Sequence, residues 1–355
     1  MDYQRKHFHT FDALRFLSFL LVFIHHIPVP ENSWFYLFTK SGDIGVSFFF
    51  VLSGFLISYI LFFEKNSKKT INLKNFFVKR VLKIWPLFYA LLLFAYLTPQ
   101  ILKLLQLSFS NEGYEPNWLM SAFFLENYKM MFSDSFPNVS PLRVMWSLCI
   151  EEHFYIIWGL LFAFIPINKI KYLIIGSLVA ANIFRGIFFY YNLPFLDVFT
   201  NIDYFAYGAI PAYILSFKKE VLIKIEKLSF AFKIATSIFT LALIFIASNL
   251  NFEWIKFIKP ILFGGLFALI LSFTITEKNS LKIKDTKWIS RLGIYTYGLY
   301  LYHTIIINLF IKLNNTLEFN WIIISILSLI TTILISILSY RIFEKQFLKL
   351  KVYFN

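Results

Sequence analysis

The sequence predicts an all-α, polytopic integral membrane protein with about ten transmembrane helices. Three observations predict this fold class: an apolar composition, ten apolar segments of suitable length, and basic residues concentrated in alternate loops. Of the 355 residues, 58% are hydrophobic and only 15% are charged, and the mean hydropathy is +0.66. A soluble domain of this length does not need so much apolar surface, so the bilayer is the expected environment.

The ten apolar segments approach the ~20 residues that a helix needs to cross a bilayer. They lie at 11–30, 44–63, 84–105, 146–167, 172–191, 202–217, 230–249, 255–276, 292–312 and 320–341. The third segment has Pro86 near its first turn. The sixth segment is short and contains Gly208 and Pro211, so we expect it to be broken or tilted.

The longest connection, 98–145, carries four prolines and predicts a structured external loop with short helices. Asn111 lies in this loop and is expected to face the outside. The sequence shows no internal repeat, so we expect one membrane domain over 1–355 with no appended soluble domain. A single cysteine, Cys149, excludes an intrachain disulfide and a zinc–cysteine cluster.

The formal net charge of +14 reflects membrane topology rather than a nucleic-acid partner. Most of the 34 lysines and arginines lie in the two tails and in every second loop, such as 65–83 and 277–287. Basic residues accumulate on the cytoplasmic side of membrane proteins. The pattern therefore predicts a multi-pass protein of the inner (cytoplasmic) membrane with both termini in the cytoplasm, where anionic lipid is a sufficient partner for the charge.

Arg15 and His26 lie inside the first segment, and ionisable residues are costly in hydrocarbon and usually functional there. Arg15 and His26 are eleven residues apart, about three helical turns, so they share one helix face roughly 16 Å apart along the axis. His25 points about 100° away. The pair predicts a polar path into the membrane with His26 as a base. The structural alternative is a snorkelling arginine and a histidine hydrogen-bonded inside the bundle.

A second polar stripe opens the fourth segment, in WSLCIEEHFYIIW at 146–158. Ser147, Glu151 and Tyr155 are spaced i, i+4, i+8 and line one helix face, whereas Glu152 is turned about 100° away. A carboxylate in this setting can orient a histidine and stabilise its imidazolium, as the aspartate does in hydrolase triads. The alternative is an interfacial glutamate at a helix start, which the helix dipole favours.

Two further polar signals have structural explanations that are favoured over functional ones. Ser53 and Gly54 interrupt the Phe-rich second segment, where small residues allow close helix contact. The ninth segment has a polar face made of Thr296, Tyr300, His303 and Thr304. For His303, a hydrogen-bonded structural role is favoured over that of a second base.

A basic cluster marks the cytoplasmic mouth of the third segment. Lys79, Arg80 and Lys83 lie at i, i+1 and i+4. Topology alone explains their charge. The same cluster could also grip phosphates.

Six motifs in sequence order resemble those of the membrane acyltransferase family 3, integral-membrane O-acyltransferases of cell-surface sugars. They are Arg15 with His26, GVSFFFVLSGF at 45–55, KRVLKIWP at 79–86, WSLCIEEHFY at 146–155, YGLYLYH at 297–303 and YRIFE at 340–344. Ser47 stands where the family usually has Asp, and His153 where it usually has Gln. Lys79 and Lys83 replace arginines, which keeps the charge but loses bidentate phosphate geometry.

The resemblance implies transfer of an acyl group, by family habit acetyl, from acyl-CoA on the cytoplasmic side to a hydroxyl of a cell-surface or lipid-linked glycan. We expect His26 to be the general base, Glu151 to orient it, and Arg15 to line the donor path. The donor-binding candidates are Ser53, Lys79, Arg80 and Lys83. The acceptor-binding candidates are Trp146, Ser147, Tyr155 and His303. No cluster of His, Asp and Glu offers a convincing ligand set, so no metal is expected.

Two alternatives stay open at this stage. An acyl-histidine relay could replace direct transfer. A proton-coupled transporter or flippase would also use buried His, Glu and Arg, but it is disfavoured by the order of the motifs and by the lack of a repeat between the two halves. The identity of the glycan and the formation of a homo-oligomer are also open.

Overall fold

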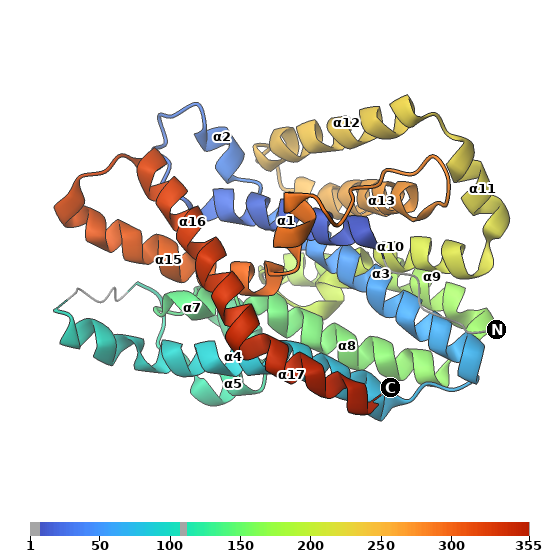
Figure 1. The fold of residues 1–355 in the computed structure, drawn as a ribbon, viewed down its shortest axis with the longest axis horizontal. Helices are drawn as coiled ribbons and strands as arrows, with labels where there is room; N and C mark the ends of the chain where they lie inside the picture. The colour runs from blue at the N-terminus through green and yellow to red at the C-terminus, as the bar shows by residue number, and fades with distance from the viewer. Residues whose placement is uncertain (1–7, 107–111, 355) are drawn as a thin grey trace.

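The computed structural model describes residues 8–106 and 112–354, apart from the side chains of 315–317, and these residues form an all-α bundle (Figure 1). The first half contains α1 (His9–His26), α2 (Tyr36–Thr39), α3 (Gly42–Lys68), α4 (Leu73–Leu104), α5 (Trp118–Ala122), α6 (Glu126–Ser133), α7 (Ser140–Arg143), α8 (Trp146–Phe164), η1 (Ile167–Lys169) and α9 (Ile170–Tyr190). The second half contains α10 (Val198–Phe217), α11 (Lys219–Lys227), α12 (Phe230–Ser248), α13 (Ile255–Ile275), α14 (Trp288–Gly293), α15 (Thr296–Leu317), α16 (Trp321–Ser339), η2 (Tyr340–Glu344), α17 (Lys345–Lys349) and η3 (Leu350–Phe354). The predicted fold class is confirmed.

Seven helical stretches in the described ranges are long and apolar enough to cross a membrane, so the chain is a multi-pass membrane protein. They are 36–68, 73–104, 146–164, 167–190, 230–248, 255–275 and 321–354. The helices α1, α10 and α15 have comparable lengths but are not among the seven. Polar residues such as Arg15 in α1 and Asp203 in α10 lower their hydropathy. The count of ten therefore stays a prediction.

Two helices differ from the lengths expected. The helix α4 begins at Leu73, where the Asn72 side chain accepts a 3.0 Å hydrogen bond from the Asn75 amide. Pro86 consequently lies inside α4 rather than near its first turn, because the basic residues before it end the apolar segment without ending the helix. The helix α10 begins at Val198 and is continuous through Pro211, so the sixth segment is not broken.

The helices α3 and α10 pack closely because each presents a glycine to the other. A Cβ atom on Gly54 would lie 2.1 Å from the carbonyl oxygen of Phe205, and one on Gly208 would lie 2.0 Å from that of Val51. The expected close contact at Gly54 is therefore confirmed. Aromatic rings fill the surrounding core, as where Phe154 stacks on Phe205 with 3.9 Å between ring centroids.

An ion pair joins α9 to α10 inside the bundle. The Arg185 guanidinium donates two hydrogen bonds to the Asp203 carboxylate, at 2.7 and 2.6 Å. Both side chains are almost fully buried, with exposed fractions of 1% and 0%. Bidentate pairing satisfies both charges and fixes how the two helices meet.

The described part of the 98–145 connection contains the expected short helices, α5, α6 and α7. The buried Glu126 carboxylate anchors it by accepting hydrogen bonds from the Tyr114 hydroxyl at 2.7 Å and the Ser121 hydroxyl at 2.6 Å. Asn111 lies outside the described residues. The external location of this loop stays a prediction.

Candidate functional site

A central cavity of about 130 Å³ collects most of the polar residues singled out in the sequence. Its walls come from α1, α3, α4, α8 and α15, together with the last residue of α14 and Ile294 after it. It is lined by Arg15, Ser53, Arg80, Lys83, Ser147, Glu151 and Tyr155 among the site candidates. Four helices, α1, α3, α4 and α8, therefore bring these residues to one place.

Glu151 is held on both carboxylate oxygens. The Ser53 hydroxyl of α3 donates to Oε1 at 2.7 Å, and the Tyr155 hydroxyl, one turn further along α8, donates to Oε2 at 3.0 Å. The i, i+4 spacing on α8 thus produces a direct bond. Both donors favour the charged carboxylate and fix its position on the cavity wall.

The central cavity carries an excess of positive charge. It is lined by three cations, Arg15, Arg80 and Lys83. Among the described residues that line it, one is acidic, namely Glu151. Arg15 also donates to the Asp12 carboxylate at 2.6 Å, one turn earlier on α1. This arrangement favours an anionic or strongly polarised ligand.

His26 lies in a second cavity, the histidine cavity, of about 390 Å³. Its lining includes His25, His26 and Trp146, and it shares Val46 and Tyr300 with the central cavity. The two cavities are therefore neighbours separated by these two side chains.

The hydrogen bonds of His26 define which ring nitrogen is available. Nδ1 donates to the Val22 carbonyl oxygen at 2.9 Å, and a carbonyl only accepts, so Nδ1 carries the proton. His303 lies beside it on α15, with its Nε2 3.3 Å from Nδ1 of His26. In turn, Nδ1 of His303 donates to the Tyr300 carbonyl at 2.6 Å. Nε2 of His26 is then the unprotonated ring nitrogen, which is able to accept a proton.

Tyr300 lies between the two cavities, and its hydroxyl fixes its position. That hydroxyl lies 3.0 Å from the Val144 carbonyl oxygen and 2.7 Å from the Ser147 hydroxyl, which itself lies 3.2 Å from the same carbonyl oxygen. The two hydroxyls therefore bond to each other and share this acceptor. Tyr300 and Ser147 are buried. This places the first residue of the α8 stripe against the helix that carries His303.

Not every predicted neighbour meets in the structure. No hydrogen bond joins Glu151 to His26 within the described ranges, because Glu151 is bonded to Ser53 and Tyr155 in the central cavity. Arg15 and His26 share α1 but line different cavities. Lys79 lies in a third cavity between α3 and α4, the α3–α4 cavity, which shares Arg80 with the central cavity. The role of Glu151 in orienting His26 stays a prediction.

The family described as an acyltransferase domain matches residues 8–341, which is nearly the whole chain. The chain belongs to this acyltransferase family. The six motifs therefore identified the family correctly.

Curated relatives of this acyltransferase include three bacterial proteins. The chain is 29% identical to the peptidoglycan O-acetyltransferase OatA of Listeria monocytogenes over 96% of its own length and 56% of the relative's. It is 34% identical to the putative peptidoglycan O-acetyltransferase YrhL of Bacillus subtilis over 41% of its length and 22% of the relative's. It is 26% identical to a putative O-acetyltransferase of Staphylococcus aureus over 84% of its length and 50% of the relative's.

The chain spans about half the length of the curated relatives that it matches over most of its own length. No solved structure matches it. Within residues 8–106 and 112–354 of this acyltransferase, no group of three His, Cys, Asp or Glu side chains could hold a metal ion.

Sequence reasoning missed three residues of this acyltransferase site. Asp12 pairs with Arg15, Tyr300 separates the two cavities, and Tyr297 lines the central cavity while its hydroxyl donates to the Ile84 carbonyl at 2.7 Å. The motif YGLYLYH already marks both tyrosines. Their spacing predicts only that they share a helix with His303. It does not predict their hydrogen-bond partners, which are Ile84 of α4 and Ser147 of α8.

Proposed function

We propose that this acyltransferase is an integral-membrane O-acetyltransferase that moves an acetyl group from a CoA thioester to a hydroxyl of a cell-wall glycan. The observation that carries the proposal is the contact between a cationic cavity and a histidine cavity, which share Val46 and Tyr300. The names of two relatives support peptidoglycan as the acceptor.

The donor would enter from the cytoplasmic side, where the basic loops are expected. Arg80 faces both the α3–α4 cavity and the central cavity, so a long donor can contact it while its thioester end reaches further in. Arg15 and Lys83 extend the positive surface inward. Pantetheine is long and flexible enough to follow such a path.

In the chemical step, Nε2 of His26 takes the proton of the glycan hydroxyl as the hydroxyl oxygen bonds to the thioester carbonyl carbon. The C–S bond then breaks, and the CoA thiolate leaves with the proton from the imidazolium. Trp146, which also lines the histidine cavity, offers an aromatic face to a sugar ring. Arg15 is near enough to the central cavity to favour the negative charge that develops on the thioester oxygen.

The test uses the protein in liposomes with radiolabelled acetyl-CoA and soluble peptidoglycan fragments. We expect the wild type to transfer acetyl groups to the fragments. The double variant Arg80→Gln with Lys83→Gln should raise the KM for acetyl-CoA by about 10-fold or more, because charge-assisted phosphate contacts contribute about 1.5–3 kcal/mol. Lys227→Gln, on the exposed helix α11, is the matched control.

An unchanged KM in the double variant would mean that Arg80 and Lys83 set the membrane topology and do not bind the donor. Absence of acetyl transfer, combined with proton-coupled uptake of a solute into the same liposomes, would replace the enzyme by a carrier. The same proposal includes a location in the cytoplasmic membrane, with both termini in the cytoplasm and a single domain over 1–355.

A further inference from the structure

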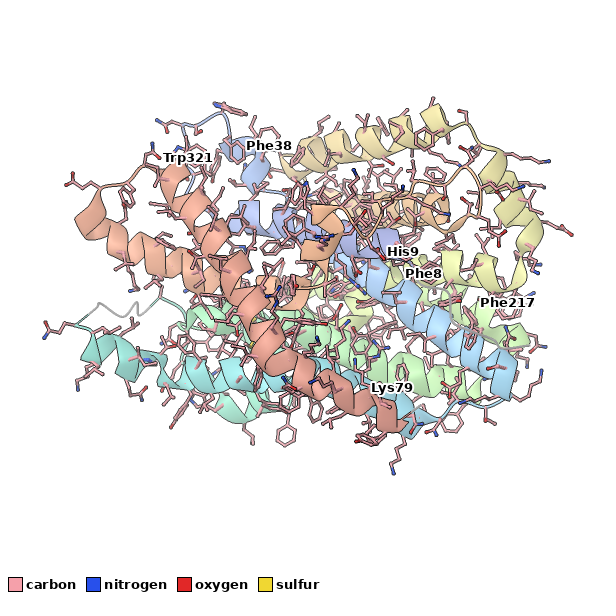
Figure 2. The ribbon with its side chains drawn as sticks, in the orientation of Figure 1. Phe8, His9, Phe38, Lys79, Phe217 and Trp321 are labelled. Carbon is pink, nitrogen blue, oxygen red and sulfur yellow. The ribbon has the colours of Figure 1, made fainter. Side chains whose placement is uncertain are left out.

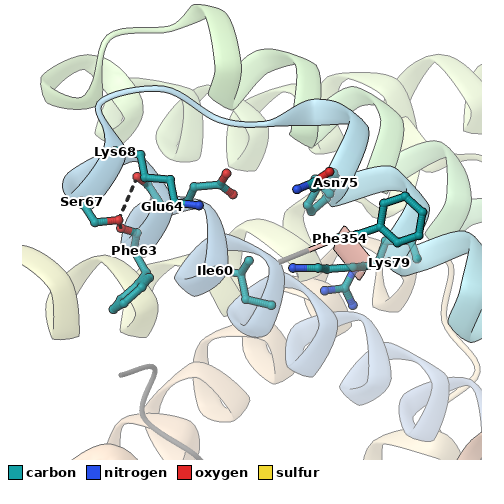
Figure 3. Close-up of a pocket in the computed structure, with 10 residues that line it drawn as sticks. Ile60, Phe63, Glu64, Ser67, Lys68, Asn75, Lys79 and Phe354 are labelled. Carbon is teal, nitrogen blue, oxygen red and sulfur yellow. Dashed lines mark hydrogen bonds between the residues drawn. The ribbon is translucent and has the colours of Figure 1, made fainter. Parts of the chain in front are cut away.

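The α3–α4 cavity has the composition of a nucleotide site. It encloses about 340 Å³ and is lined by Phe63, Phe76 and Phe354, by Lys68, Lys79 and Arg80, and by Ile60, Glu64, Ser67 and Asn75. Aromatic rings provide flat faces on which a base can stack, and the three cations attract phosphate. Figure 3 draws Phe354 and Lys79 on one side of the cavity and Ser67 and Lys68 on the other.

The C-terminal segment supplies one wall of this cavity. The elements α17 and η3 pack against α4, near Lys79, as Figure 2 also shows. They are held through Ser339, whose hydroxyl donates to Glu344 at 3.2 Å and accepts from the Tyr302 hydroxyl at 3.0 Å. Phe354 reaches the cavity from the end of η3.

The same segment adds a further cation. Lys351 does not line the cavity itself, but it lies in the same element, η3, as the lining residue Phe354 and is close enough to Lys79 and Arg80 for their like charges to repel. Gathering like charges destabilises the protein unless an anion is present, because each pair repels. The carboxylate that lines this cavity, Glu64, already accepts a 2.9 Å hydrogen bond from the Asn72 amide.

Arg80 ties the α3–α4 cavity to the central cavity. Its guanidinium lies 5.8 Å from the ring centre of Phe76 and 5.9 Å from that of Tyr155, which bonds to Glu151. A ligand that leaves the first cavity past Arg80 therefore arrives beside Glu151. This suits a nucleotide that carries a long acyl-bearing arm.

We propose that the α3–α4 cavity binds the purine nucleotide end of the donor, with the purine against Phe354 and Phe76 and the phosphates against Lys79, Arg80 and Lys351. The inference rests on the proposed use of a CoA thioester. Anionic lipid headgroups share the phosphate chemistry but lack the purine, so the aromatic contacts separate the two ligands.

The experiment measures binding of adenosine 3′,5′-bisphosphate, which has neither pantetheine nor thioester, to the protein in phosphatidylcholine nanodiscs by titration calorimetry. Phe354→Leu should raise the Kd at least about 5-fold, because base stacking contributes about 1–3 kcal/mol. Lys351→Gln should raise it about 10-fold and lessen its salt dependence. Phe354→Tyr, which keeps the ring, should bind as the wild type does.

Two neighbours that do not line the cavity serve as matched controls. Tyr353→Leu removes a ring that is 82% exposed, and Lys349→Gln removes an exposed cation bonded to Gln346; both should change the Kd by less than 2-fold. Pyrophosphate is the second probe. Its weaker binding should respond to Lys351→Gln and not to Phe354→Leu.

The proposal is overturned if the bisphosphate does not bind the wild type, or if the control variants weaken it as much as the test variants. It is also overturned if pyrophosphate binds as tightly as the bisphosphate and if neither ligand binds in phosphatidylglycerol nanodiscs. The cavity would then hold a lipid headgroup. Acetyl transfer is assayed separately. Transfer with unaltered KM in Lys351→Gln and Phe354→Leu would refute this site alone, whereas loss of all transfer in the wild type would refute the proposed function.

Discussion

At the scale of single residues, His26 differs from its neighbour His25 in what holds the ring. Both line the histidine cavity, and both donate from Nδ1 to a carbonyl, His25 to Thr39 at 2.6 Å and His26 to Val22 at 2.9 Å. His26 is additionally packed against the buried His303, with 4.9 Å between the ring centroids. This extra contact supports the proposal that His26 is the base, because a ring in a fixed geometry lowers the cost of reaching the transition state.

We therefore expect His26→Ala to lower acetyl transfer by about 10²–10⁴-fold, the usual contribution of a general base. His25→Ala should retain most of the activity. Transfer rates of the purified variants, normalised to folded protein, provide the measurement. An inactive His25→Ala together with an active His26→Ala would show that the base is misassigned.

Glu151→Gln tests whether the carboxylate acts with His26 although no direct bond joins them. The amide keeps the size of the side chain but loses the charge that Ser53 and Tyr155 stabilise. We expect a loss of at least about 10²-fold in kcat, and a double variant with His26→Ala that is little worse than either single one, because groups that act together fail together. Additive losses would indicate independent roles.

At the scale of helices, the buried pair Arg185–Asp203 determines how α9 meets α10. Removing one partner leaves an uncompensated buried charge, which typically costs about 3–5 kcal/mol, whereas replacing both by apolar residues is much better tolerated. Arg185→Leu and Asp203→Leu should each lower the unfolding temperature in detergent, and the double variant should recover more than half of the loss. A double variant as unstable as the sum of the two would contradict this interpretation.

Close packing of α3 on α10 depends on the two glycines that face each other, Gly54 and Gly208. Gly54→Ala places a methyl group 2.1 Å from a backbone oxygen, so the helices must separate at a cost of about 1–3 kcal/mol. Gly176→Ala is the control, because nothing lies within 4 Å of its added Cβ. We expect a lower unfolding temperature for Gly54→Ala and an equal or higher one for Gly176→Ala. Equal effects would mean that the helices adjust freely.

At the scale of the whole molecule, the direction of acetyl transfer depends on which side of the membrane each cavity faces. In the proposed orientation, the α3–α4 cavity faces the cytoplasm and the histidine cavity faces the outside, because basic loops are expected on the cytoplasmic side. In a background with Cys149→Ser, an impermeant maleimide should label Glu115→Cys in intact cells and Lys227→Cys only after permeabilisation. Both positions are exposed. The reverse labelling pattern would invert the proposed direction of transfer.

The sequence by itself determined the all-α membrane fold, the family and most of the polar residues of the central cavity. Hydropathy and charge are summed along the chain, and the spacing of Ser147, Glu151 and Tyr155 follows from helical geometry alone. Only the tertiary structure decided which of these residues meet. Ser53 reaches Glu151 because α3 packs beside α8, and His303 lies against His26 because α15 packs beside α1. Such pairings depend on how helices distant in sequence pack, and helical periodicity carries no information about that packing.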